Sequence, residues 1–190
     1  GFAIGWVKKE HLLQPQKKVR PGNLLLGIPS SGLHSNGFSL VRRLLAMNVF
    51  ALEEILPEEK KPLGEILTRP TRIYAPFLSK LLKRFPGDIL GLAHITGGGI
   101  PDNLVRILPE NVSAILYSTS FSPPPIFSFL QKRGNIPDEE MWRVFNMGIG
   151  MILICEEKKA GKIQQWARKE GEILVPMGEI CEGKRGVFWQ

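Results

Sequence analysis

Apolar residues follow two patterns along this chain: short continuous runs, and stretches in which they recur with a period near 3.6. The continuous runs are typical of buried strands and predict strands over residues 23–28, 112–117, 149–155, 173–180 and 186–189. The periodic stretches predict helices over residues 38–47, 73–84, 100–108, 123–133, 138–145 and 158–170. The two kinds of element are interleaved without a regular βαβ repeat, which favours an α+β fold with helices layered on a mixed sheet.

Two of these helices have a clear apolar face. In residues 38–47, Val41 and Leu44 fall on one side of the helix with Leu45. In residues 158–170 the inward positions are Ile163, Trp166 and Ala167, and Gly171 is the expected stop. Residues 48–70 are interrupted by three prolines, so we expect short helices there at most.

Length and composition indicate a folded domain. The 190 residues, with 43% hydrophobic and 23% charged residues, predict one domain over residues 1–190 that needs no disulfide or metal to fold. Residues 1–22 begin mid-element and read as the end of, and connector from, a preceding domain. No apolar run approaches the roughly 18 residues that span a bilayer, so we expect no membrane partner. Cys155 and Cys181 form no CxxC pair, which favours reduced thiols in the cytoplasm.

The net charge of +7 favours an anionic partner. The basic residues occur in small groups, and no long basic run or aromatic RNA-binding motif is present. A phosphorylated metabolite is therefore expected rather than nucleic acid.

The first loop that could carry chemistry has the sequence SSGLHSNG and joins a strand to a helix. Its polar residues and glycines are candidates to bind an anion beside the positive end of the following helix, namely Ser30, Ser31, Gly32, His34, Ser35 and Asn36. The alternative is an ordinary turn, because Ser, Asn and Gly are favoured in any strand-to-helix loop.

The second loop, HITGGG, runs into a helix start at IPDN. Three consecutive glycines cost conformational entropy and indicate a close backbone approach to a ligand or to a neighbouring element. The candidate residues are Thr96, Gly97, Gly98, Gly99 and Asn103. His94, judged alone, is more often a structural histidine than a catalytic one.

A third loop, Asn146 to Met151, enters an apolar strand, and its glycines favour close backbone packing. Asn146 is expected to orient a neighbouring loop at most. No HxxxH, HExxH or carboxylate cluster is present, so no metal site is predicted. No GxSxG sequence points to a covalent nucleophile.

Taken together, the three loops and their order resemble the phosphoribosylformylglycinamidine cyclo-ligases, also called aminoimidazole ribonucleotide synthetases. The matching stretches extend from near residue 1 to about residue 180 and include GNLLLGIPSSGLHSNGFSLVRRLL, LTRPTRIY, GLAHITGGGIPDNLVRILP, FNMGIGM and MGEI. Residues 118–121 depart from the tryptophan-containing stretch expected before the prolines. The resemblance implies a C-terminal domain with a three-layer α/β/α arrangement on a mixed sheet, joined to an N-terminal ATP-binding domain that is not in this sequence.

That resemblance implies an ATP-dependent reaction of purine biosynthesis. ATP phosphorylates the formyl amide oxygen of formylglycinamidine ribonucleotide, and the amidine nitrogen then closes the imidazole ring. ATP and Mg²⁺ are expected to be bound mainly by the N-terminal domain, which would also build a homodimer. His94 is implied as the catalytic contact to phosphate or developing negative charge, and His34 as a weaker contact to substrate.

Under this interpretation the chain alone is inactive or nearly so. Two alternatives stay open at the level of sequence. One is another enzyme of the same ATP-using superfamily, of the selenophosphate synthetase or thiamine-phosphate kinase type, against which SGLHSNG and FNMGIGM argue. The other is a non-catalytic module that binds phosphorylated ligands.

Overall fold

The computed structural model describes residues 2, 4–119 and 121–190. Gly1, Ala3 and Ser120 lie outside it, and with them two residues of the expected connector and one of the divergent stretch 118–121. The strands are β1 (Asn23–Pro29), β2 (Ile55–Leu56), β3 (Lys61–Pro62), β4 (Ile89–His94), β5 (Val112–Leu116), β6 (Ile149–Glu156), β7 (Val175–Glu182) and β8 (Gly186–Trp189).

The α-helices are α1 (Pro15–Lys18), α2 (Phe38–Ala46), α3 (Leu63–Leu67), α4 (Ala75–Arg84), α5 (Gly99–Leu104), α6 (Pro125–Gly134), α7 (Asp138–Val144) and α8 (Glu157–Lys169). Two 3₁₀ helices, η1 (Lys9–His11) and η2 (Val105–Ile107), complete the described elements. The predicted helix over residues 100–108 is therefore divided between α5 and η2.

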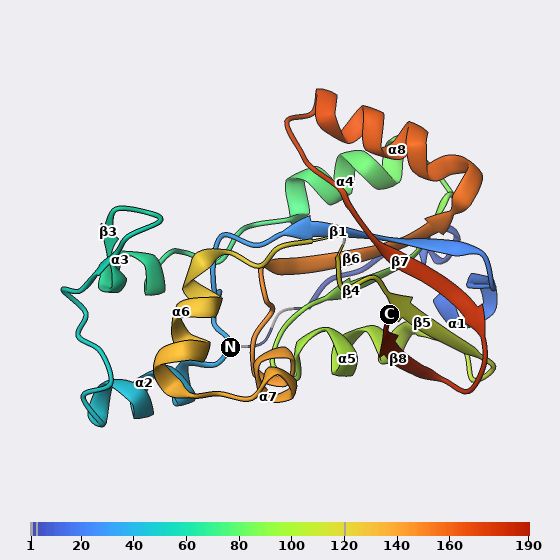
Figure 1. Ribbon diagram of the computed structural model, residues 1–190. Helices are drawn as coiled ribbons and strands as arrows, with labels where there is room; N and C mark the ends of the chain where they lie inside the picture. Colours follow the sequence, from blue (N-terminus) through green and yellow to red (C-terminus); the bar gives the residue numbers. More distant parts are fainter. Residues whose placement is uncertain (1, 3, 120) are drawn as a thin grey trace.

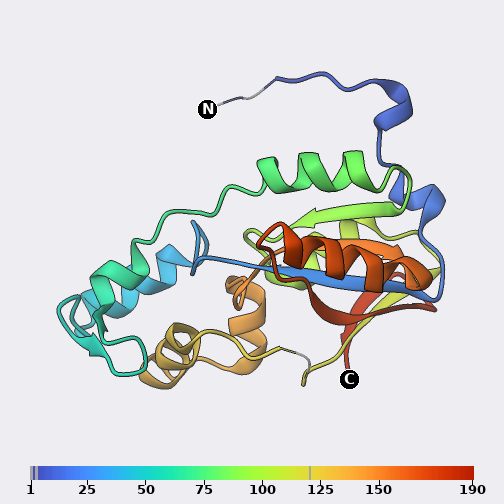
Figure 2. The same cartoon turned by 90° about the horizontal axis from the view of Figure 1, so that it is seen from above.

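Six strands form one mixed sheet in the order β4-β6-β1-β7-β5-β8. All neighbouring strands run antiparallel except β5 and β8, which are parallel. Helices α4 and α8 lie side by side over one face of the sheet, and α5 lies on the other (Figures 1 and 2). The expected α+β fold, with three layers and a mixed sheet, is confirmed.

Side chains of the central strands alternate between two cores because both faces of the sheet are covered. Leu25 points to the core beneath α5, whereas the next residue, Leu26, points to the core beneath α4 and α8. Ile152 and Leu153 of β6 divide in the same way. This burial on both faces explains why the strands read as continuous apolar runs.

A third core lies beyond the end of the sheet and joins α2, α3, α6 and α7 (Figure 1). Val41 and Leu44 of α2 are buried there, and Leu45 packs against the same cluster, as the pattern predicted. Phe127 and Phe145 are fully buried and meet edge to face, with ring centroids 5.9 Å apart. This core fixes the start of α2 beside the end of β1.

The predicted apolar face of α8 is confirmed by the full burial of Ile163 and Ala167, with Trp166 partly buried against the same core. Gly171 has φ 82° and its N–H bonds back to the Arg168 carbonyl, so the helix ends where expected.

Candidate functional site

Three loops meet at one end of the three adjacent strands β4, β6 and β1. Strands β1 and β4 end there, at Pro29 and His94, whereas β6 runs antiparallel to both and begins there at Ile149. Pro29 is paired with Ile149, and His94 with Met151. The sheet register therefore brings together the loops 30–37, 94–103 and 146–150, which are far apart in the sequence.

Hydrogen bonds join the three loops directly. The Ser30 N–H donates to the Gly148 carbonyl at 2.8 Å, and the Ile95 N–H donates to the Gly150 carbonyl at 2.9 Å. The Asn36 side-chain amide donates to the Ile95 carbonyl at 3.5 Å. The first and second loops are thus neighbours, as a shared ligand site requires.

Asn146 holds the first loop from beneath. Its side chain is fully buried and its Nδ2 donates to the carbonyls of Gly32 at 2.9 Å and Leu33 at 3.2 Å. Its Oδ1 accepts from the Gly148 N–H at 2.8 Å and from the Ser30 hydroxyl at 3.3 Å. The expectation that Asn146 orients a neighbouring loop is confirmed.

The serines of the first loop divide into two groups. The Ser30 hydroxyl donates to the Gly32 carbonyl at 2.8 Å, and the Ser31 hydroxyl to the Pro70 carbonyl at 2.7 Å, so both shape the loop itself. Ser35 is exposed, and its hydroxyl lies 3.4 Å from that of Thr71. Of these three serines Ser35 is the most exposed, so its hydroxyl group is accessible to a ligand.

His34 lies within the first loop in the left-handed region, with φ 56° and a side chain only 5% exposed. Its Nε2 accepts a hydrogen bond from the Ser31 N–H at 3.1 Å, and the Arg72 N–H lies 3.5 Å away. Burial, helped by the nearby His94 and Arg72, lowers the pKa of His34 to about 4. The imidazole is therefore neutral at physiological pH, and its proton lies on Nδ1.

Three residues that sequence reasoning did not assign to the site lie around the two histidines. The Tyr74 ring lies between them, with centroids 6.1 Å from His34 and 6.2 Å from His94. The Tyr74 hydroxyl donates to the Pro29 carbonyl at 3.0 Å, and burial raises the pKa of this phenol to about 12. Arg72 stacks over the Tyr74 ring at 5.4 Å and forms an ion pair with Glu172. Two of these three residues, Arg72 and Tyr74, lie in the stretch LTRPTRIY, which is one of the stretches that carried the family resemblance.

Asn103 shapes the glycine-rich loop. This buried side chain donates from Nδ2 to the carbonyls of Thr96 at 3.3 Å, Gly97 at 3.2 Å and Gly99 at 2.7 Å. The Thr96 hydroxyl donates to its Oδ1 at 3.1 Å. All these polar atoms of Asn103 are engaged within the loop, so its contribution is to hold the loop's shape.

The consecutive glycines serve different purposes. Gly99 has φ 62°, and a Cβ built on it would lie 1.8 Å from the Trp142 carbonyl oxygen, so packing against α7 explains this glycine. A Cβ on Gly97 would meet nothing within 4 Å, and Gly97 is exposed. The backbone at Gly97 is therefore open to a ligand. His94, the last residue of β4, is also exposed.

Among residues 2, 4–119 and 121–190, no group of three or more His, Cys, Asp or Glu side chains is placed to hold a metal ion. Cys155 and Cys181 are both free thiols. No helix in the described part of the chain is long and apolar enough to cross a membrane. The loops instead offer neutral hydrogen-bond donors and backbone amides, which suit an anionic ligand.

Comparison with known proteins yields a family and several relatives. Residues 20–190 match the family described as AIR synthase related protein, C-terminal domain. The chain is 45% identical over 184 residues to the phosphoribosylformylglycinamidine cyclo-ligase of Geobacillus thermodenitrificans, covering 96% of this chain and 52% of that protein. It is 40% identical over 190 residues to the chloroplastic enzyme of that name from Arabidopsis thaliana, covering 100% of this chain and 48% of the relative. The chain thus spans about half the length of the curated relatives it matches.

Similar folds occur in solved structures of lower sequence identity. Thiamine-monophosphate kinase from Stenotrophomonas maltophilia superimposes with a TM-score of 0.65 at 17% identity, over 97% of this chain and 54% of the kinase. A hydrogenase maturation protein from E. coli gives a TM-score of 0.56 at 16% identity, over 92% of this chain and 47% of the other. These structural similarities support the α+β fold described above.

Proposed function

We propose a function for this chain from the premise that it belongs to the family of AIR synthase related proteins, matching their C-terminal domain. The chain supplies one wall of the active site of an ATP-dependent phosphoribosylformylglycinamidine cyclo-ligase. It acts on formylglycinamidine ribonucleotide in purine biosynthesis. The single observation that carries this proposal is the meeting of the loops 30–37, 94–103 and 146–150 at one end of β4, β6 and β1.

The reaction needs positioned charge more than covalent chemistry. The amide oxygen of the substrate attacks the γ-phosphorus of ATP, and ADP leaves. The amidine nitrogen then attacks the activated carbon, the imidazole ring closes, and the C–O bond breaks to release inorganic phosphate. The open backbone at Gly97 suits the negative charge that develops on the transferred phosphate.

His94 is proposed as the residue of this chain that contacts the transferred phosphate or the developing negative charge. It is exposed, and it is held near His34 through the Tyr74 ring. Ser35, Thr96 and the glycines after it are proposed to contact the substrate, whereas Ser30, Ser31, Asn36 and Asn103 shape the two loops that carry them.

ATP and Mg²⁺ would have to be held mainly by another part of the enzyme. The described residues form no cluster of carboxylates fit for Mg²⁺, so no step is assigned to a metal held by this chain. The loops can contact phosphate oxygens of a nucleotide through neutral donors alone.

Residues 1–22 are proposed as the end of, and connector from, an N-terminal ATP-binding domain. Phe2, Ile4 and Trp6 are 105%, 100% and 88% exposed, and they occur at every second position, the spacing of one face of an extended strand. Residues 4–12 run outside the three layers (Figure 2). We further propose that the complete enzyme is a cytoplasmic homodimer assembled mainly through that domain.

The proposal is tested by turnover. The chain is assayed for substrate-dependent release of ADP, first alone and then together with an ATP-binding half from a 45%-identical relative. We expect activity only in the mixture or in a fusion of the two halves. Full activity of the isolated chain would contradict the proposal of a half-built site, and no activity in any combination would support a non-catalytic module instead.

A further inference from the structure

A cavity of about 630 Å³ opens between the start of α2 and the segment that follows α3. Its walls come from the first loop and α2 on one side and from residues 67–71 on the other. The lining includes hydroxyl groups of Ser35, Ser39 and Thr71 and the guanidinium groups of Arg42 and Arg69. No carboxylate lines it, so the cavity is polar and positively charged.

The N-terminus of α2 forms part of this cavity without a side-chain cap. Gly37 is the N-cap residue, with φ 73°, and no side chain bonds to the first N–H groups of the helix. A Cβ on Gly37 would lie 2.1 Å from the Phe145 ring, so packing forbids the Ser or Asn that usually caps a helix. Gly37, Phe38 and Ser39 line the cavity, so the positive end of this nine-residue helix lies beside it.

His34 supplies an independent indication that a ligand binds here. It lines the same cavity, and its Nδ1 is the buried side-chain atom that lacks a hydrogen-bond partner within the described residues. Because Nε2 already accepts the Ser31 N–H, the ring proton lies on Nδ1 and makes this atom a donor. Burying a donor without an acceptor costs about 1 to 3 kcal/mol, and a ligand oxygen would remove that cost.

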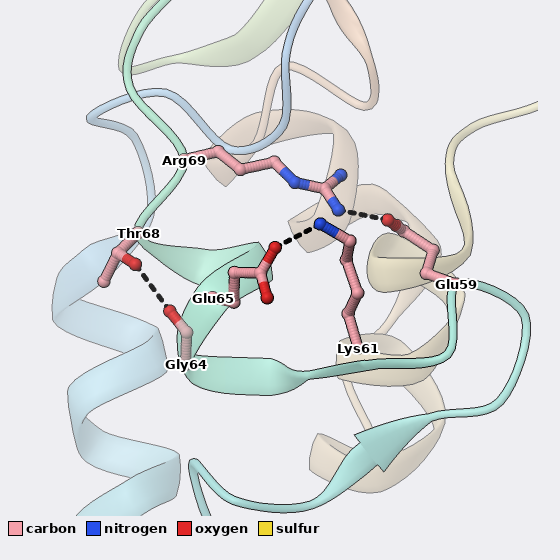
Figure 3. A network of polar contacts seen from close by, with 6 residues as sticks. All are labelled: Glu59, Lys61, Gly64, Glu65, Thr68 and Arg69. Carbon is pink, nitrogen blue, oxygen red and sulfur yellow. Dashed lines mark hydrogen bonds and ion pairs between the residues drawn. The ribbon is translucent and has the colours of Figure 1, made fainter.

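The two arginines differ in how far the protein already neutralises them. Arg69 forms an ion pair with Glu59, beside a second pair between Lys61 and Glu65 (Figure 3). Arg42 has no ion pair among residues 2, 4–119 and 121–190. The uncompensated positive charge of the cavity therefore belongs chiefly to Arg42 and to the helix end.

We propose that this cavity binds the dianionic phosphate of a phosphate monoester, with Arg42 and the α2 N-terminus as its main contacts and His34 as a neutral donor. The inference rests on the proposed function and assigns the sugar-phosphate end of the ribonucleotide to this place. The reacting formyl amide would then extend toward the glycine-rich loop. Ser39, Arg42, Arg69 and Thr71 become binding residues that the sequence did not single out.

Binding of ribose 5-phosphate to the 190-residue chain tests the inference by calorimetry. We expect Arg42→Gln to weaken binding by about tenfold or more, because it removes a charge-assisted contact. Arg43→Gln is the matched control, since Arg43 lies on the same helix, loses the same charge and does not line the cavity. Equal weakening by both variants would reduce the effect to general electrostatics and overturn the inference.

A second readout follows the His34 Nδ1–H proton by NMR. Ribose 5-phosphate should shift this proton downfield, and unphosphorylated ribose should not. ATP is the third probe, and it distinguishes a sugar phosphate from a nucleotide phosphate as the ligand. A response to ATP alone overturns the sugar-phosphate assignment. The outcomes also separate this inference from the cyclo-ligase proposal. Phosphate binding without turnover in the fused enzyme leaves the cavity assignment standing, whereas turnover with an unchanged KM in Arg42→Gln refutes it.

Discussion

Replacing Asn146 by alanine tests whether one buried amide holds the first and third loops together. The substitution removes four hydrogen bonds: to the carbonyls of Gly32 and Leu33, from the Gly148 N–H and from the Ser30 hydroxyl. The two carbonyls keep other donors, the Ser30 hydroxyl and the Asn36 N–H, so the main group left without a partner is the Gly148 N–H. At about 1 kcal/mol for each lost bond, with some recovery by water, we expect a loss of about 3 kcal/mol in the free energy of unfolding.

Urea denaturation followed by circular dichroism measures this loss, and a thermal midpoint lowered by about 6 to 12 °C should accompany it. Asn111→Ala is the matched control because Asn111 is exposed and its side chain makes no hydrogen bond within the described residues. Hydrogen exchange at Ser30 should quicken in the Asn146 variant, since its N–H bonds to the Gly148 carbonyl. A change within about 0.5 kcal/mol of the control would refute the reasoning.

Three further predictions concern the surroundings of His34 and the thiols. A Cβ on Gly150 would lie 2.0 Å from the Tyr74 hydroxyl oxygen, so Gly150→Ala should lower the free energy of unfolding by about 1 to 3 kcal/mol. The loss should be smaller in a Tyr74→Phe background, and equal losses in the two backgrounds of a double-mutant cycle would contradict this. Because the pKa of His34 falls from 6.5 to about 4 on folding, the unfolded chain takes up its proton first, and stability should fall by about 2 kcal/mol between pH 6.5 and pH 5. His34→Gln should remove that part of the pH dependence in denaturation curves, and an unchanged dependence would argue against a neutral His34. Cys155 is buried and its pKa is raised to about 12, so a thiol reagent at pH 8 should label the partly exposed Cys181 first. Labelling of both cysteines at the same rate would contradict the burial of Cys155.

The sequence was sufficient for the layers of the fold because burial on both faces leaves continuous apolar runs such as residues 23–28. It missed β4, although Ile89–His94 is largely buried, since Gly91 and the following glycine-rich loop obscured the run. The third core was not predicted either. It joins α2, α3, α6 and α7 from distant parts of the chain, and no local pattern encodes that contact.

For the candidate site, the sequence identified loops that the fold brings together, but not the direction in which each side chain points. Ser30 and Asn103 were expected to bind a ligand, yet their polar atoms are engaged within their own loops. The protonation state of His34 depends on the N–H groups of Ser31 and Arg72, and Arg72 is 38 residues away in sequence. Only the folded chain shows that approach, so the tautomer could not be inferred from the SGLHSNG sequence.

The most direct test is hydrogen exchange of the chain fused to an ATP-binding half, with and without formylglycinamidine ribonucleotide. The loops 30–37 and 94–103 meet through the contact of Asn36 with Ile95, and both should gain protection together when the ribonucleotide binds. The surface of α4 and α8, on the sheet face away from α5, should not change. Protection confined to α4 and α8, or to one loop without the other, would contradict the claim that these loops form one ligand site.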